Sequence, residues 1–358
     1  MSNKNFRNIG ALVVIALLIL TTALIGCATK QTTTATSSLP TTYTVTDMLG
    51  RTVVVPSNIQ RVITFNAVPP LNSFIMAMGK GNTIINGIPA SMAKMPQAKY
   101  QTILAPQIAN GPDLGSTPNV EQILTLKPDV VITSEQATVT ALQNTSIPVI
   151  CLKSALSKED VETTMNILGQ VFGTLDKAKE YNQYFDAKLA WLNKSIASIP
   201  MNKRPKVLNM WAQIMAGFNA SWWIEPAGGI DAFDPKGMSG GYGGVTVRYQ
   251  ISTEKLLLWN PDIIIVRDAS DIPSLEKNTQ LNNLNAVKNK RVYVAPAGTF
   301  TWNGAVETPL MSEWAATKFY PDLFKQSDLI KDIESFYKQF LGYQLTDQQA
   351  EEMTKGLQ

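Results

Sequence analysis

Residues 119–133 read Asn-Val-Glu-Gln-Ile-Leu-Thr-Leu-Lys-Pro-Asp-Val-Val-Ile-Thr, and residues 252–266 repeat the pattern as Ser-Thr-Glu-Lys-Leu-Leu-Leu-Trp-Asn-Pro-Asp-Ile-Ile-Ile-Val. Each copy predicts a short capped helix, a Pro-Asp turn and an apolar strand. Such a strand is buried on both faces, as in a parallel sheet covered by helices. The copies lie 133 residues apart, too far for a solenoid repeat, so they predict two similar α/β lobes in one chain.

Alternating strands and helices surround the first copy. Strands are predicted at residues 61–65, 84–88 and 148–152, and a helix at residues 157–172, where Ser157 begins a capping box. This alternation predicts a doubly wound parallel sheet.

A long helix is predicted between the two copies, because residues 174–197 contain neither Gly nor Pro and carry apolar residues at helical spacing. Such a helix spans about 35 Å, the width of a small domain. We therefore expect an N-terminal lobe at residues 43–173, a rigid linking helix at residues 174–198, and a C-terminal lobe with terminal helices at residues 199–358.

The beginning of the chain predicts a leader and an anchor. Residues 1–26 have the basic start and apolar middle of a secretory signal peptide, and residues 24–27 read Leu-Ile-Gly-Cys, as in bacterial lipoproteins. We expect Cys27 to carry a lipid that holds the chain at the outer face of the cytoplasmic membrane. Residues 27–42 are rich in Thr and Ser and predict a flexible tether. The alternative is an ordinary signal peptide with an incidental cysteine.

Composition excludes several classes of function. The chain has no histidine, which removes the commonest general base and zinc ligand and every Ser-His or Cys-His pair. Its 31 Lys and Arg residues, two of them in the leader, nearly balance 28 Asp and Glu residues, which argues against a nucleic-acid partner. Cys151 is the only cysteine of the predicted folded part and ends an apolar run, so we expect a buried residue. No catalytic residue, cofactor or metal ligand is predicted.

Several motifs resemble a known family. Residues 47–51 read Asp-Met-Leu-Gly-Arg, residues 61–63 read Arg-Val-Ile, and residues 228–231 read Gly-Gly-Ile-Asp. With Pro56, the two repeat copies and the long middle helix, they resemble the periplasmic binding proteins of ABC importers for iron-siderophores, heme and cobalamin. The resemblance covers roughly residues 43–325. It implies two α/β lobes joined by one α-helix, a ligand cleft between them, and a monomer that delivers its ligand to a permease dimer and its ATPase.

Glu121 and Glu254 stand at matching positions of the two copies. An acid in the first turn of a helix is favoured by the helix dipole, by about 0.3–1 kcal/mol, and this alone could explain both residues. In the resembled family, matching glutamates form salt bridges with arginines on the two permease subunits. Two equivalent acids suit a two-fold-symmetric partner, so we expect both to dock on the transporter.

The ligand cleft is expected at the loops beyond the carboxyl ends of the strands, where ligands of open α/β sheets gather. Aromatic residues there favour a large, flat ligand, and arginines favour its carboxylates; some of the aromatics could instead belong to the core. The predicted ligand-binding residues are Asn66, Ser134, Glu135, Trp211, Trp222, Trp223, Tyr242, Arg248, Arg267 and Trp302.

The sequence therefore predicts a lipid-anchored solute-binding protein for an iron(III) chelate of the siderophore type. Corrinoid, heme and molybdate or tungstate remain alternative ligands. Because histidine is absent, an axial imidazole for a metal is excluded. From other classes, a secreted hydrolase could use Glu135, Asp268 and Glu307 as paired carboxylates, and an extracellular sensor could share the same fold.

Overall fold

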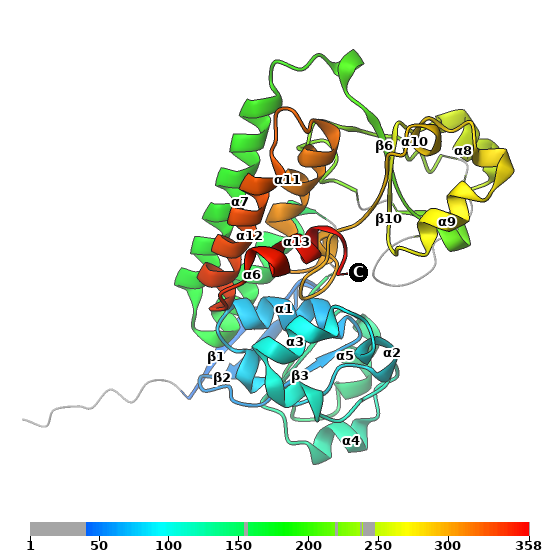
Figure 1. Cartoon of the computed structure of the whole chain (residues 1–358). Coiled ribbons are helices and arrows are strands. Elements are labelled where there is room, and N and C mark those ends of the chain that lie inside the picture. Colours follow the sequence, from blue (N-terminus) through cyan, green and yellow to red (C-terminus); the bar gives the residue numbers. More distant parts are fainter. Residues whose placement is uncertain (1–40, 154–156, 219–220, 237, 239–247, 358) are drawn as a thin grey trace, which may run out of the picture. The chain divides into compact units, whose positions relative to one another are not determined.

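Two separate sheets with parallel strands at their centres organise the chain (Figure 1). The computed structural model describes residues 41–153, 157–218, 221–236, 238 and 248–357. The predicted leader, Cys27 and nearly all of the tether lie outside these residues. Within the described part of the chain, no helix combines the length and the hydrophobicity that crossing a membrane requires.

The first sheet is parallel, with strand order β3–β4–β5. All three strands are buried along their whole length, and the register pairs Val62 with Val130 and Val131 with Val149. The prediction of a buried parallel sheet from the first repeat copy is thus confirmed. The elements of this half are β1 (Thr42–Thr46), β2 (Thr52–Pro56), β3 (Val62–Phe65), α1 (Val68–Ala77), α2 (Ala90–Ala93), α3 (Ala98–Leu104), α4 (Val120–Thr125), β4 (Val130–Thr133), α5 (Gln136–Leu142), β5 (Val149–Cys151) and α6 (Lys158–Phe172).

The prediction of a strand at residues 84–88 is wrong. Only one bridge forms there, between Ile84 and Val62. Beyond it the side chain of Asn86 takes the place of a backbone partner: its Oδ1 accepts from the Thr64 amide at 2.9 Å, and its Nδ2 donates to the Thr64 carbonyl at 3.0 Å. The edge of β3 is therefore satisfied without a further strand.

The second sheet is mixed, with strand order β11–β10–β6–β7–β9 and with β8 also pairing with β6. Its centre is parallel and pairs Ile264 with Leu208 and with Val292, whereas β7 pairs antiparallel with both neighbours. The elements are β6 (Lys206–Trp211), β7 (Ala216–Phe218), β8 (Ile230–Asp231), β9 (Arg248–Gln250), α8 (Thr253–Trp259), β10 (Ile263–Val266), α9 (Asp271–Glu276), α10 (Asn285–Lys288) and β11 (Val292–Val294).

One helix of 22 residues, α7 (Leu175–Ile196), connects the two sheets in chain order, as the sequence predicts. It is not isolated, because α11 (Thr308–Phe319) and α12 (Gln326–Phe336) lie along it (Figure 1). The Tyr181 hydroxyl on α7 donates to the Val306 carbonyl at 2.6 Å. A π-helical turn (Tyr337–Leu341) and α13 (Asp347–Thr354) follow α12.

One hydrophobic core runs from the first sheet through α7 to the C-terminal helices. It joins residues as distant in sequence as Val62, Tyr181 and Trp314. Two smaller cores cover the remaining faces of the sheets, one around Ile63 and Val131 and the other around Leu208. The chain after β11 therefore packs largely with α7 and with the helices of the first sheet.

Candidate ligand-binding site

At the carboxyl end of the first sheet, the predicted residues are held by hydrogen bonds to neighbouring threonines and to the Ala67 amide. Asn66 follows β3 in the left-handed backbone region, with φ of 68°, which asparagine tolerates better than most residues. Its Oδ1 accepts hydrogen bonds from the hydroxyls of Thr133 and Thr138, each at 2.7 Å. Ser134 accepts from the Ala67 amide at 3.3 Å, and the Glu135 amide donates to the Thr133 hydroxyl at 3.3 Å. The structure thus brings Asn66, Ser134 and Glu135 together.

The first turn of α1 begins in the same place and offers no free amide. The Val68 amide donates to the Asn66 carbonyl at 2.9 Å, and the Leu71 amide donates to the Ala67 carbonyl at 3.0 Å. The two residues between them are Pro69 and Pro70, which have no N–H group. This helix start is therefore unable to bind an anion through its backbone.

At the carboxyl end of the second sheet, Trp211 and Arg267 form a stacked pair. Trp211 ends β6 and Arg267 follows β10, and these parallel neighbours pair Met210 with Val266. The Arg267 guanidinium carbon lies 4.7 Å from the centre of the Trp211 ring. The Arg267 side chain is 27% exposed, and its Nε lies 3.7 Å from a carboxylate oxygen of Asp268. A cation and an aromatic face thus stand together at a strand end, partly open to solvent.

The loop after Arg267 is fixed by Asp271. Its carboxylate accepts hydrogen bonds from the Gln213 amide at 2.8 Å and from the Asp268 amide at 3.1 Å. Burial raises the pKa of Asp271, although these amides oppose the shift. The segments that carry Trp211 and Arg267 are thereby tied to one buried side chain.

Two of the predicted ligand tryptophans are buried inside the protein, and a third is half-buried. Trp223 and Trp302 are 0% exposed and belong to the main core, which corrects the prediction that they bind the ligand. Trp222 is half-buried, and its ring lies 5.7 Å from that of Phe185 on α7. Large apolar rings gain most by leaving water, so these loops fold inward.

Two further predicted residues are not described in full. Tyr242 lies outside the described residues. Arg248 begins β9, and its backbone pairs with that of Phe218, but its side chain is also outside the described part.

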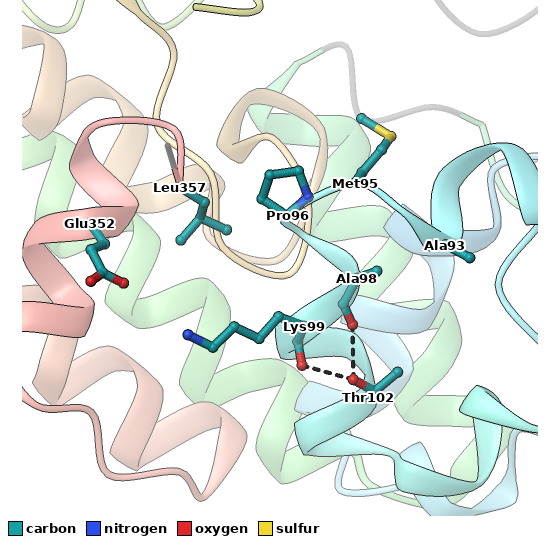
Figure 2. A pocket seen from close by; sticks show the side chains of 8 residues that line it. All are labelled: Ala93, Met95, Pro96, Ala98, Lys99, Thr102, Glu352 and Leu357. Atoms are coloured by element: carbon teal, nitrogen blue, oxygen red, sulfur yellow. Dashed lines mark hydrogen bonds between the residues drawn. The ribbon is translucent and has the colours of Figure 1, made fainter.

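A cavity that the sequence did not indicate opens between α3 and α13 (Figure 2). Its volume is about 410 Å³. The Lys99 side chain extends toward α13, which carries Glu352, so the two walls hold opposite charges. The Thr102 hydroxyl is occupied by the Ala98 and Lys99 carbonyls at 3.1 and 3.0 Å. None of the ten predicted ligand residues lines it, and no motif links two helices so far apart in sequence.

Beside this cavity, α3 is tied to the loop that follows β11. The Gln101 side-chain amide donates to the Pro69 carbonyl at 2.8 Å and to the Thr299 carbonyl at 3.0 Å. Glu307 holds the same loop from within: it is fully buried and accepts from the Thr299 amide at 2.6 Å and the Tyr337 hydroxyl at 2.5 Å. Burial raises the pKa of Glu307. A side chain enclosed in this way cannot reach a substrate, so Glu307 gives no support to a hydrolase.

The repeat glutamates lie on the surface. Glu121 is exposed on α4 and Glu254 on α8. The predicted caps are confirmed: Asn119 accepts from the Gln122 amide at 3.1 Å, and Ser252 accepts from the Lys255 amide at 3.2 Å. Across the described residues, no group of three or more Cys, Asp or Glu side chains could hold a metal ion.

Comparison with known proteins places this geometry in a family. The sequence profile of the periplasmic binding protein family matches residues 89–299. The molybdate-binding protein MolA of Haemophilus influenzae is 24% identical over 335 residues, which is 83% of this chain and 90% of that protein. An iron(3+)-hydroxamate-binding protein of Bacillus subtilis, YxeB, is 22% identical and covers 83% of this chain and 91% of its own length.

Solved structures show the same fold. A periplasmic solute binding protein from Veillonella parvula superposes with a TM-score of 0.73 at 28% identity, covering 88% of this chain and 97% of that one. Molybdate-bound MolA of Haemophilus influenzae superposes with a TM-score of 0.71 at 21% identity, covering 85% and 99%. The chain thus has the two-lobed α/β fold of these proteins and belongs to the periplasmic binding protein family, the solute-binding components of ABC importers.

Proposed function

We propose that this solute-binding protein captures an anionic iron(III) chelate of the siderophore type and delivers it to the permease of its importer. The observation that carries the proposal is the stacked pair of Trp211 and Arg267 at the carboxyl end of the second sheet. In open α/β sheets ligands bind beyond this end of the strands.

The pair suits such a ligand for a geometric reason. The Trp211 ring covers one face of the Arg267 guanidinium. The N–H groups of Arg267 lie in the guanidinium plane and project from its edge. Those groups match carboxylate, catecholate or hydroxamate oxygens, with which an arginine forms charge-assisted hydrogen bonds. The indole adds apolar surface for the organic part of a chelate.

The start of α1 favours a chelate over a free oxyanion. A small oxyanion needs several convergent donors, and the first turn of α1 has none to give, because its amides are bonded or replaced by proline. A large chelate brings its own metal ligands and can be held by a few contacts at its edge. Such a chelate needs no metal ligand from the protein, which agrees with a chain that has no histidine.

Molybdate is the second candidate, and one finding favours it. MolA, named as a molybdate-binding protein, matches over 83% of this chain.

Heme and corrinoid are less well supported as ligands. The burial of Trp223 and Trp302 removes aromatic surface that a flat macrocycle would need. For molybdate, an arginine and a serine hydroxyl such as that of Ser134 could contribute to an oxyanion site.

A thermal-shift screen of the purified mature chain decides between these ligands. Ferric siderophores, cobalamin, hemin, molybdate and tungstate are each added in excess. A ligand at 100 times its dissociation constant stabilises the folded state by about 2.7 kcal/mol. We expect a ferric siderophore to raise the unfolding temperature, and a shift with the oxyanions alone would overturn the iron assignment in favour of the second candidate.

The proposal also covers how the ligand is delivered to the permease. We propose that the lipid on Cys27 holds the chain at the outer face of the membrane and that the tether to residue 42 lets it reach the permease. The lobes at residues 43–173 and 199–358, joined by the linking helix at residues 174–198, would each present one docking glutamate, Glu121 or Glu254. Exposure of both side chains supports this role, because a docking acid must be reachable.

A further inference from the structure

The two repeat helices expose leucines beside their glutamates. Leu124 on α4 is 43% exposed, and Leu257 on α8 is 40% exposed. The next residue of α8, Leu258, is 80% exposed, the highest exposed fraction recorded for a large hydrophobic side chain in the described part of the protein. Leu124 and Leu257 occupy the same position of the repeat, three residues after the glutamate in each copy.

These leucines contribute little to the core of the protein. The residues that attach the helices to their sheets are Ile123, which is 1% exposed, and Leu256, which is 0% exposed. A single exposed leucine on a protein surface needs no explanation. Here the exposure recurs at equivalent positions of two helices 133 residues apart, and each time it stands beside an exposed acid.

Helix geometry makes each acid and its leucine one surface. Residues three and four apart on a helix lie on the same face, with Cβ atoms about 5–6 Å apart. Glu121 and Leu124 are three apart, and Leu257 and Leu258 lie three and four residues after Glu254. Each helix therefore presents a carboxylate with apolar surface directly next to it.

We propose that Leu124 on one helix, and Leu257 with Leu258 on the other, are apolar contacts for the permease of the importer. The inference rests on the proposed docking role of Glu121 and Glu254 and adds a second kind of contact to it. A partner with basic groups matches the acids, and its two-fold symmetry matches the duplicated surface. The charges set orientation and encounter rate, and the leucines supply affinity by leaving water.

Salt separates the two contributions, because ions screen exposed charges and leave apolar contacts largely unaffected. The test measures binding of the whole mature chain to the permease–ATPase complex of its importer, reconstituted in lipid nanodiscs, at low and high salt. The variants are the triple change Leu124→Ser, Leu257→Ser and Leu258→Ser, and the pair Glu121→Gln and Glu254→Gln. The matched control is Leu323→Ser, because Leu323 is 52% exposed and lies between α11 and α12.

We expect the triple leucine variant to bind the complex about tenfold more weakly or worse, with the same dependence on salt as the unaltered chain. The glutamate pair should weaken binding and also flatten the salt dependence, and Leu323→Ser should change neither. Unfolding temperatures close to that of the unaltered chain show that each variant is folded. If the unaltered chain binds and the triple variant binds equally well, the leucine contact is wrong and glutamate docking stands. If the unaltered chain does not bind, both fail.

Discussion

At the scale of single residues, the proposed capture of a ligand depends on Trp211 and Arg267. Their stacking depends on the adjacency of β6 and β10, which brings together two side chains 56 positions apart in the chain. Asp271 holds the loops behind them through the Gln213 and Asp268 amides. The planar guanidinium can therefore meet a ligand with little loss of side-chain freedom.

Replacement of this arginine by lysine tests the geometry as well as the charge. Arg267→Lys keeps the positive charge and removes the planar fork, so we expect ligand affinity to fall about tenfold or more in isothermal titration. The control is Arg204→Lys, because Arg204 precedes β6 and lies at the opposite end of that strand. Equal affinity in Arg267→Lys and the unaltered chain would show that the fork is not used.

Gly298, in the loop after β11, is closely surrounded by other side chains. A Cβ atom at Gly298 would lie 2.2 Å from the Tyr337 hydroxyl and 2.3 Å from an oxygen of Glu307. Gly298→Ala should lower the free energy of unfolding by about 1–3 kcal/mol in urea denaturation. Gly304→Ala is the matched control, because nothing lies within 4 Å of the Cβ position there. Similar losses in both variants would contradict the close packing of this loop.

At the scale of elements, α7 is held to α11 and α12 by a partly buried ion cluster. The Lys188 ammonium on α7 lies 2.8 Å from Glu313 and 2.5 Å from Asp332. The Glu313 side chain is only 3% exposed. Burial raises the pKa of Glu313 to about 7, an effect that Lys188 opposes and Asp332 reinforces. Burial also acts to lower the pKa of Lys188, but the two carboxylates outweigh it and leave that pKa raised.

The raised pKa of Glu313 predicts a pH dependence of stability. The folded chain binds this proton more tightly than the unfolded chain, so the contribution is complete below about pH 4.5 and is lost as the pH rises through about 7. We expect the free energy of unfolding to fall by roughly 1–3 kcal/mol over this range on account of Glu313.

Glu313→Gln should remove that part of the fall, measured by urea denaturation at pH 5 and pH 7. Asp231, whose pKa burial raises to about 6, and Glu307 act in the same direction and remain in both proteins. The quantity to compare is therefore the difference in the free energy of unfolding between Glu313→Gln and the unaltered chain at each pH. An unchanged pH slope would mean that Glu313 does not titrate in this window.

Elements with local signals could be predicted from the sequence. Ser157 caps α6 by accepting from the Asp160 amide, and Gly173 ends it with φ of 66°. The fully apolar strands of both copies are buried, and α7 occupies residues 175–196 of the 174–198 predicted. These features depend on neighbours within a few residues, which the sequence displays directly.

Features that depend on distant segments could not be predicted. Trp302 lies in a short turn and would be taken for a loop residue, but the chain around it folds into the core that α7 and the C-terminal helices share. The Asn86 side chain replaces a strand that its apolar neighbours predict. The cavity of about 410 Å³ joins α3 to α13, elements from opposite ends of the described chain. At the candidate site, Trp211 and Arg267 could be predicted because they lie at strand ends, whereas the burial of Trp223 and Trp302 could not.

At the scale of the whole molecule, the repeat copies give one acid to each half of the chain. The double reversal Glu121→Arg and Glu254→Arg should abolish uptake of the ligand by cells, because each new arginine would meet the basic groups that we propose on the permease. Ligand affinity of the purified variant should stay within about twofold, since both acids lie on α4 and α8 and not at the carboxyl ends of the strands. A loss of ligand affinity would show that these acids serve the cleft instead of docking.

The most direct test of the account is native mass spectrometry of the mature chain with an equimolar mixture of a ferric siderophore, cobalamin, hemin and molybdate. We expect a one-to-one complex with the ferric siderophore that is lost in Arg267→Ala and kept in Arg204→Lys. A complex with molybdate alone, or a siderophore complex that Arg267→Ala leaves intact, would contradict it.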